Sequence, residues 1–182
     1  LMIDPDTGLV TGMLPNDASA GGPYVVVVTA DDGMGVMTVE SFVWTVDNIA
    51  PVLDRPQPDV TAMDGSPVEI PVAGNFSDPD GDPLIFAAEG LPPGFESDPG
   101  TGVISGTLDI HASVDGPFTV IVTAADPQGG IVTDLFTIRS ENPAPVAGPI
   151  DPINVPVGES IDVDLSSQFT DEDGDPLRFT AP

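Results

Sequence analysis

Cysteine and lysine are absent from the 182-residue chain, and histidine, tryptophan and tyrosine occur once each. Without cysteine the chain can form neither a disulfide framework nor a thiolate metal site. The single histidine, His111, has no second histidine with which to share a transition metal, so we interpret it as a surface residue. Ser105 is an unconvincing nucleophile, because the surrounding Gly-Val-Ile-Ser-Gly lacks the spacing of a nucleophile elbow. With a single histidine in the chain, no convincing catalytic triad can be built. We therefore predict that the protein is not an enzyme.

Positive charge is scarce, since three arginines stand against 30 aspartates and glutamates and the formal net charge is −27. Such a field repels phosphate, which argues against nucleic acid and anionic membranes as partners. Cations, neutral surfaces such as glycans, and further copies of the protein remain. Self-repulsion also destabilises a compact state unless bound divalent cations or a saline medium offset it. We place Ca²⁺ first among the predicted ligands.

Long apolar runs are also missing. The longest, such as residues 24–28, are far too short to cross a bilayer, so no membrane span is predicted. No signal-peptide pattern opens the chain at Leu1. A hydrophobic content of 40%, arranged in patterned β-branched runs, argues against disorder.

Apolar residues alternate with polar ones over several short stretches, including 68–72, 118–124 and 24–30. This period of two is typical of half-buried strands, and no stretch shows a useful helical period. Turn sequences such as Pro-Pro-Gly at 92–94 and Asp-Gly-Pro at 115–117 separate the stretches. The pattern predicts an all-β fold.

The chain contains an internal repeat. The segment IDPDTGLVTG at 3–12 recurs as SDPGTGVISG at 97–106, which is 94 residues later. The segment FSDPDGDPLIFAA at 76–88 recurs as FTDEDGDPLRFTA at 169–181, displaced by 93. One repeat is therefore about 93 residues long, with about seven short strands.

On this register the chain divides into three parts. Residues 1–47 are the C-terminal half of one repeat, 48–142 form a complete repeat, and 143–182 are the N-terminal half of a third. Two explanations stay open: the chain is cut from a longer array, or the front half of one copy completes the back half of the next. The second explanation predicts head-to-tail assembly into filaments.

The motifs of the complete repeat occur in a fixed order. Asn-x-x-Pro begins at Asn48, Phe-x-Asp-x-Asp-Gly-Asp-x-Leu at Phe76 and Gly-Leu-Pro-x-Gly-Phe at Gly90. Asp-x-x-Thr-Gly-x-Ile-Ser-Gly begins at Asp98, and Thr-Ala-x-Asp-x-x-Gly precedes a closing Phe-x-Ile strand that reaches Ile138. This order resembles the dystroglycan-type cadherin-like and Ig-like tandem repeat domains of secreted microbial proteins. The resemblance implies tandem Ig-like/cadherin-like β-sandwich repeats with Greek-key topology, an extracellular or cell-surface setting, and calcium.

Acidic residues crowd the loop that follows Phe76. Asp78, Asp80 and Asp82 lie within five positions, where mutual repulsion is costly without a cation. In a sandwich of this topology, this loop, the loop before the last strand and the linker from the preceding repeat share one end. Six oxygen-bearing residues then suit the six to eight ligands of Ca²⁺. The predicted metal ligands of the first joint are Asp47, Asn48, Asp78, Asp80, Asp82 and Asp126.

The same loop recurs one repeat later, which predicts a second joint. Asp32 aligns with Asp126 and is predicted to serve a joint upstream of residues 1–47, unless exchange of half domains brings it to the third repeat. Solvated acidic turns are the alternative interpretation of all these clusters. An EF-hand is excluded, because Pro83 stands where its sharp turn requires glycine. The predicted ligands of the second joint are Glu141, Asn142, Asp171, Asp173 and Asp175.

Together these observations favour an extracellular structural or adhesive repeat protein in which calcium rigidifies the joints between domains. Its predicted partners are neighbouring copies of the repeat and a cell-surface glycan or protein. The alternative is a glycan-binding accessory module of a secreted carbohydrate-active protein. That alternative requires aromatic residues repeated at equivalent exposed positions, and the sequence shows none.

Overall fold

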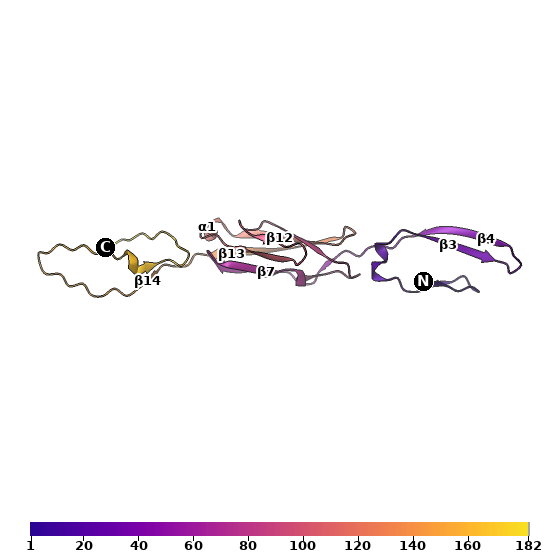
Figure 1. Cartoon of the computed structure of the whole chain (residues 1–182), viewed down its shortest axis with the longest axis horizontal. Coiled ribbons are helices and arrows are strands. Elements are labelled where there is room, and N and C mark those ends of the chain that lie inside the picture. The colour runs from indigo at the N-terminus through magenta and orange to yellow at the C-terminus, as the bar shows by residue number, and fades with distance from the viewer. Residues whose placement is uncertain (182) are drawn as a thin grey trace.

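A computed structural model describes residues 1–181, so Pro182, the last residue of the third predicted segment, lies outside the described residues. The described chain forms three units in a row (Figure 1). A two-layered β-sandwich stands in the middle, and a more open segment flanks it on each side. We call residues 1–47 the first segment and residues 143–181 the third segment.

The central sandwich consists of short strands, as the alternation of apolar and polar residues predicts. Besides these strands it contains one turn of helix, α1 (Ala112–Asp115), and a short 3₁₀ turn, η2 (Ala73–Asn75). Its strands are β5 (Val52–Leu53), β6 (Val60–Met63), β7 (Pro67–Pro71), β8 (Phe76–Ser77), β9 (Ile85–Glu89), β10 (Glu96–Ser97), β11 (Val103–Thr107), β12 (Phe118–Ala125) and β13 (Ile131–Glu141).

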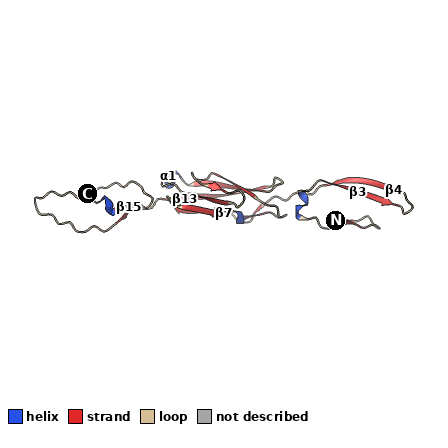
Figure 2. Cartoon of the chain, in the orientation of Figure 1, coloured by secondary structure: helices blue, strands red, loops and turns tan. Residues whose placement is uncertain are grey.

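Two sheets make up the sandwich (Figure 2). One has the order β6-β13-β12-β9, and the other has the order β10-β11-β7. All pairs are antiparallel except β6 with β13, which run parallel. Because the chain passes between the sheets after β6, β7, β9 and β11, the topology is the predicted Greek key.

The inward faces of the two sheets supply one hydrophobic core. On β12, Val120, Val122 and Ala124 are at most 1% exposed, whereas their neighbours point outward. Phe136 and Ile138 on β13 are equally buried. The period of two therefore places every second residue in the core, as expected for a half-buried strand. Other buried members of the core are Ile70, Val72, Phe76, Phe86, Phe95, Ile104, Leu108 and Ala112.

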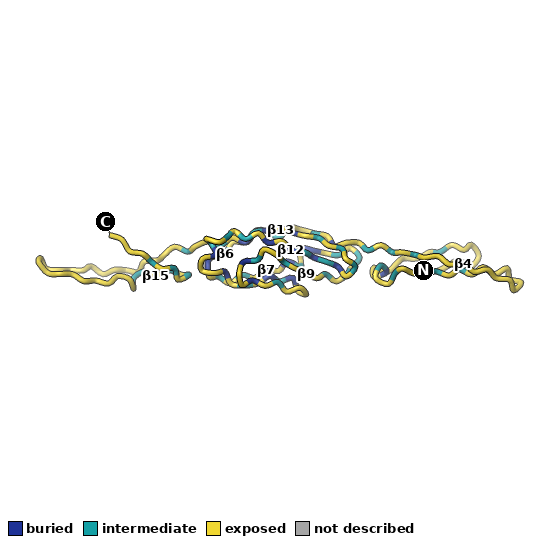
Figure 3. The backbone as a smooth tube through the Cα atoms, turned by 90° about the horizontal axis from the view of Figure 1, so that it is seen from above, coloured by how far each residue is buried: buried dark blue, intermediate teal, exposed yellow. Residues whose placement is uncertain are grey.

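The first segment repeats half of this sandwich. It contains β1 (Met2–Ile3), β2 (Val10–Thr11), a 3₁₀ turn η1 (Asn16–Ser19), β3 (Tyr24–Asp31) and β4 (Met37–Trp44). β1 pairs with β2 and β3 with β4, in the same registers as β10 with β11 and β12 with β13. Since the opposing strands are missing, most of its apolar side chains are exposed (Figure 3).

The third segment has little regular structure. It contains β14 (Val146–Ala147), a 3₁₀ turn η3 (Ser166–Gln168) and β15 (Phe169–Thr170). Residues 160–164, which correspond to β7, form no strand here. In the central sandwich β7 pairs with β11, and the described third segment has no counterpart of β11. No helix of the described residues is long and apolar enough to span a membrane.

The burial of Phe136 in the core leads to a stability prediction. We expect Phe136→Ala to lower the free energy of unfolding of the central sandwich by about 3–5 kcal/mol, because it removes a large side chain that is 1% exposed. Leu135→Ala is the matched control on the same strand, since Leu135 is 60% exposed and its loss should cost within about 0.5 kcal/mol. Urea unfolding followed by far-ultraviolet circular dichroism measures both. Equal costs for the two variants would contradict the assignment of the core.

Candidate metal centre

The first acidic cluster lies in the loop between β8 and β9. Oδ1 of Asp78 accepts the backbone N–H groups of Asp80, Gly81 and Asp82 at 3.0–3.2 Å. Gly81 has a φ of +85°, a conformation in which other residues are strained. The Asp78 carboxylate therefore holds the loop in a tight turn, and this turn brings the three aspartates together.

The three carboxylates of this loop leave oxygen atoms that no protein group satisfies. One oxygen from each of Asp78, Asp80 and Asp82 lies within 4.8 Å of the others. Asp78 Oδ2, Asp80 Oδ1 and Asp82 Oδ2 are buried and accept no hydrogen bond within the described residues. Buried acceptors without partners are costly, and a hard cation with oxygen ligands removes that cost. The donor set therefore fits Ca²⁺.

The electrostatics of the loop show the cost of crowding three carboxylates. Burial, followed by the interaction with Asp80, raises the pKa of Asp78. Burial together with the negative charges of Asp80, Asp126 and Asp17 raises the pKa of Asp82. The interaction with the Asp78 side chain and the hydrogen bond from the backbone N–H of Ile49 lower the pKa of Asp80. Two of the three carboxylates thus resist ionisation when no cation is bound.

The linker and the β12–β13 turn meet this loop, as predicted. Asn48 donates from Nδ2 to Asp126 Oδ2 at 2.8 Å, and the backbone N–H of Ile49 donates to Asp80 Oδ2 at 3.1 Å. Oδ1 of Asp126 accepts the N–H groups of Gln128 and Gly130. Both oxygens of Asp126 therefore have partners, and this residue orients Asn48 next to the three-carboxylate cluster.

Two predicted ligands of the first segment are not part of this cluster. Asp47 is exposed, and its carboxylate belongs to neither three-carboxylate group. Asp32 lies in the β3–β4 turn, where its Oδ1 accepts the N–H groups of Met34 and Val36. That turn stands at the far end of the first segment, away from the central sandwich (Figure 1). Asp32 therefore takes no part in the first joint, and its role at a joint upstream of residues 1–47 stays a prediction.

Sequence reasoning missed a contribution from η1 of the first segment. The charge of Asp17 helps to raise the pKa of Asp82. The side-chain nitrogen of Asn16 lies next to Gly81 of the acidic loop. Ser19 Oγ lies 3.5 Å from Asn48 Oδ1. The preceding repeat therefore supplies polar groups of its own to the first joint. Sequence position gave no signal for this, since η1 is distant from every acidic motif.

The second cluster repeats the first at the joint with the third segment. One oxygen from each of Asp171, Asp173 and Asp175 lies within 4.8 Å of the others. Asp171 Oδ1 accepts the N–H of Asp175 at 3.3 Å, and both oxygens of Asp173 are buried without hydrogen-bond partners. The interaction with the Asp171 side chain and burial raise the pKa of Asp173. The second donor set fits a hard cation in the same way.

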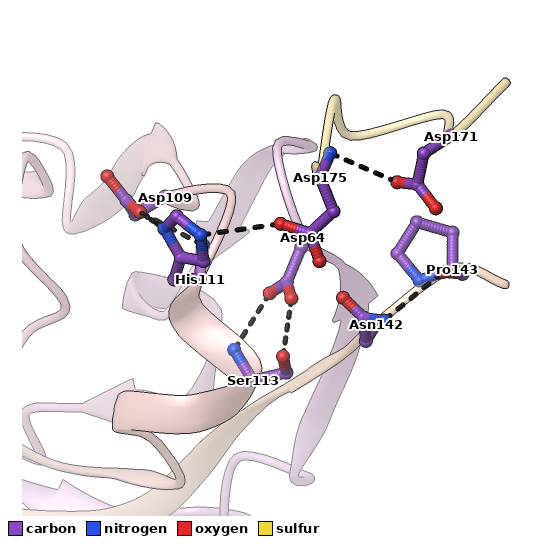
Figure 4. Close-up of polar contacts among 8 residues, drawn as sticks. All are labelled: Asp64, Asp109, His111, Ser113, Asn142, Pro143, Asp171 and Asp175. Atoms are coloured by element: carbon purple, nitrogen blue, oxygen red, sulfur yellow. Dashed lines mark hydrogen bonds and ion pairs between the residues drawn. The ribbon is translucent and has the colours of Figure 1, made fainter. Parts of the chain in front are cut away.

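His111 reaches across the second joint from an exposed position, in agreement with its interpretation as a surface residue. Its Nε2 lies 3.3 Å from Asp175 Oδ1, and its Nδ1 lies 3.6 Å from Asp109 Oδ1 (Figure 4). Its side chain is 55% exposed. His111 occupies the position of Asp17 one repeat earlier, and Glu172 occupies the position of Pro79, so the two joints carry different charged groups.

The predicted ligands Glu141 and Asn142 do not reach the second cluster in the way that Asn48 approaches the first. Glu141 ends β13 with an exposed side chain, and its carbonyl accepts the N–H of Asp64. Asn142 donates to the carbonyl of Pro143 at 3.2 Å (Figure 4). The buried Asp64 instead fastens this end of the sandwich, by accepting hydrogen bonds from Ser113 and Ser140.

The sequence model of the family described as Putative Ig domain matches residues 50–141, just over half of the chain. The chain belongs to the Putative Ig domain family. The Putative Ig domain coincides with the central sandwich from β5 to β13 and contains Asp78, Asp80 and Asp82. The resemblance predicted from the order of motifs is thereby confirmed at the level of an Ig-like domain.

Relatives of this Putative Ig domain protein include the mouse protein Cadherin EGF LAG seven-pass G-type receptor 1, which is 30% identical over 138 residues. That match covers 70% of this chain and 4% of the receptor's length. The solved EC22-24 fragment of mouse cadherin-23 has a TM-score of 0.43 at 18% identity, covering 76% of this chain and 48% of the fragment. A Bacteroides fragilis protein named as a putative α-galactosidase has a TM-score of 0.41 at 27% identity, covering 59% of this chain and 21% of that protein.

The raised pKa of Asp82 makes a prediction about the cation-free protein. Ionising a group whose folded-state pKa is raised costs folding stability at pH values above that pKa. Asp82→Asn removes this cost, so we expect a higher melting temperature than the parent chain in EDTA at pH 7. Calcium should then raise the melting temperature of the variant less than that of the parent chain. Differential scanning calorimetry with and without calcium measures both effects.

Glu69→Gln is the matched control, because it removes one negative charge from an exposed position on β7. If Glu69→Gln raises the melting temperature in EDTA as much as Asp82→Asn does, the effect reflects net charge and not the crowded loop.

Proposed function

We propose that the protein is an extracellular structural or adhesive repeat protein, and that calcium rigidifies the joints between its domains. The observation that carries this proposal is the set of buried carboxylate oxygens at both joints that have no hydrogen-bond partner. Each set lies where one unit of the chain meets the next: Asp80 accepts the backbone N–H of Ile49 in the linker, and Asp175 lies 3.3 Å from His111 of the central sandwich. A cation bound at the first joint would lie beside the linker, because the backbone N–H of Ile49 already donates to Asp80 and Asn48 donates to Asp126.

At the first joint, Asp78, Asp80 and Asp82 would hold the ion, and Asn48 and Asp17 would join them from the linker and the first segment. Calcium supplies positive charge and a flexible shell of six to eight oxygen ligands. The protein orients these groups by hydrogen bonds. Asp78 accepts backbone N–H groups of its own loop, the N–H of Ile49 donates to Asp80, and Asp126 accepts a hydrogen bond from Asn48. A bound cation would restrict the relative motion of neighbouring domains, so that the tandem array behaves as a stiff rod.

Charge supports the same proposal. With a formal net charge of −27, the domains repel one another, and the cation-free joints add local repulsion. Extracellular modules bind calcium with dissociation constants of about 10⁻⁴ to 10⁻³ M. Affinities in this range would keep the joints loaded outside a cell and empty at the much lower free calcium concentrations inside one.

The glycan-binding alternative has less support from the described residues. Glycan platforms use exposed aromatic side chains for stacking, yet Trp44 and Tyr24 line an apolar groove of the first segment together with aliphatic residues. Of their equivalents in the central sandwich, Ile138 is a buried core residue and Phe118 is partly buried and packs against the core. Core packing therefore explains both aromatics, and we place glycan binding behind the calcium joint.

Isothermal titration calorimetry with calcium tests the proposal. The 182-residue chain should bind two ions with dissociation constants of about 10⁻⁴ to 10⁻³ M. Asp80→Ala should remove one binding event and Asp173→Ala the other, because each deletes a carboxylate from one cluster. Glu69→Gln, with a similar change in charge, should bind as the parent chain does. Absence of heat and of any rise in melting temperature in the parent chain would remove calcium from the account.

The difference between the joints allows a gain-of-function test. His111 stands where the first joint has Asp17, so His111→Asp should add a carboxylate to the second joint. Calcium affinity grows with the number of ligand charges, and we expect an increase of about threefold to tenfold at the second joint. Calorimetry in an Asp80→Ala background isolates that joint. A lower calcium affinity of the second joint in His111→Asp would contradict the equivalence of positions 17 and 111.

A further inference from the structure

The single histidine has a carboxylate beside each of its ring nitrogens. Nδ1 of His111 lies 3.6 Å from Asp109 Oδ1, and Nε2 lies 3.3 Å from Asp175 Oδ1 (Figure 4). A neutral imidazole has one N–H and one lone pair, so it can donate to only one of these two oxygens. Its other nitrogen then faces a carboxylate oxygen as acceptor against acceptor. A cation held between that nitrogen and that oxygen replaces this repulsion by coordination.

The surroundings of the ring favour Nε2 as the nitrogen that meets the cation. Asp109 is held beside Nδ1, because its Oδ1 also accepts the backbone N–H of His111 at 2.9 Å. Asp175 Oδ1 is buried and accepts no hydrogen bond within the described residues. A histidine that binds a metal through one nitrogen usually donates its other N–H to a carboxylate, which orients the ring. Asp109 stands in the place of that orienting carboxylate.

The second acidic cluster supplies further ligands next to this nitrogen. One oxygen of Asp175 lies within 4.8 Å of an oxygen from each of Asp171 and Asp173, and both oxygens of Asp173 are buried without partners. Zn²⁺ binds imidazole nitrogen and carboxylate oxygen at about 2.0–2.2 Å, which places neighbouring ligand atoms of a tetrahedral ion about 3.3–3.5 Å apart. The 3.3 Å between Nε2 and Asp175 Oδ1 matches this spacing. Carboxylates complete the donor set, so a second histidine is not required.

The first joint offers a different donor set. Asp17 stands there in the place of His111, and the chain has no other histidine and no cysteine. Carboxylate oxygens suit Ca²⁺, whereas imidazole nitrogen suits Zn²⁺ and its neighbours in the transition series. The two joints therefore differ in the class of metal that they favour, although their acidic loops share the pattern Asp-x-Asp-Gly-Asp.

We propose that the second joint binds a divalent transition ion of the Zn²⁺ class through His111 Nε2, Asp175 and Asp173, and that Asp109 orients the imidazole. This inference rests on the proposed function, because it assigns a second kind of cation to one of the two calcium joints. Zn²⁺ binds this joint more tightly than Ca²⁺ does, since the nitrogen ligand favours it. The second joint then responds to zinc, and the first joint responds to calcium.

Nuclear magnetic resonance of the imidazole tests the proposal on the full chain. Because His111 is the only histidine, the imidazole ¹H–¹³C signals belong to it alone. In metal-free buffer at about pH 8, where a histidine of ordinary pKa is neutral, Zn²⁺ should shift these signals and Ca²⁺ should move them much less. Calorimetry should give a dissociation constant for Zn²⁺ at least about tenfold below that for Ca²⁺ at this joint. Imidazole signals that stay in place at saturating Zn²⁺ would overturn the proposal.

Variants separate the ligand from the positioning residue. His111→Asp should lower the affinity for Zn²⁺ while raising that for Ca²⁺, and these opposite changes cannot come from unfolding. Asp109→Asn should weaken Zn²⁺ binding about tenfold and change the imidazole signals of the metal-free chain, because the ring loses its orienting carboxylate. Asp115→Asn is the matched control, with the same change of charge at an exposed position of α1. An equal loss of Zn²⁺ affinity in Asp115→Asn would reduce the role of Asp109 to net charge and contradict it.

The outcomes distinguish this zinc site from the calcium joints. If Ca²⁺ binds at both joints and Zn²⁺ leaves the imidazole signals unshifted, the zinc site fails and the proposed function stands. If Zn²⁺ shifts the signals and Ca²⁺ gives no heat at either joint, the proposed function fails and the zinc site stands. Zn²⁺ binding that keeps its full affinity in His111→Gln would show unspecific attraction to acidic residues, and it would overturn the zinc site.

Discussion

Repulsion among carboxylates at the ends of the domains governs the behaviour of this chain. Each three-aspartate loop is closed by its first member: Asp78 accepts backbone N–H groups from the loop it begins, and Asp171 accepts one in the same way. These hydrogen bonds make the loops compact, but they leave the other buried carboxylate oxygens without hydrogen-bond partners. The fold therefore concentrates negative charge where consecutive units meet, and under the proposed function a bound cation would relieve this repulsion.

This arrangement connects composition with architecture. A chain with −27 formal charges and three arginines has few ways to hold neighbouring domains together through ion pairs of its own. The central sandwich is stable through its core, which is independent of the acidic loops. Linker residues such as Asn48 and Ile49 connect the units through single hydrogen bonds to Asp126 and Asp80. Cation binding at these points would decide whether the units form a rod or move independently.

Much of the fold could be predicted from the sequence. The alternation at 118–124 and 68–72 anticipated β12 and β7, and the internal repeat anticipated that β1 to β4 match β10 to β13. Strands in the third segment were less predictable from pattern alone. A strand needs a neighbour for its backbone hydrogen bonds, and residues 160–164 have none within the described chain. Local pattern and pairing therefore agreed where both partners were present.

The candidate site was only partly accessible from the sequence. The clusters around Asp80 and Asp173 follow from spacing within one loop, which sequence displays directly. The roles of Asp17 and His111 depend on how η1 and the turn before α1 meet loops far along the chain, and no local motif reports such a contact. Asp47 and Glu141 were expected as ligands because of their linker positions, yet both side chains are exposed.

A distance measurement across the first joint tests the central claim most directly. The absence of cysteine allows spin labels at Val27→Cys and Ile121→Cys, equivalent exposed positions on β3 and β12, diluted with unlabelled chain. Double electron–electron resonance should give a broad distribution in EDTA that narrows to a single distance in millimolar calcium. A distribution that stays equally broad at saturating calcium would contradict a calcium-rigidified joint.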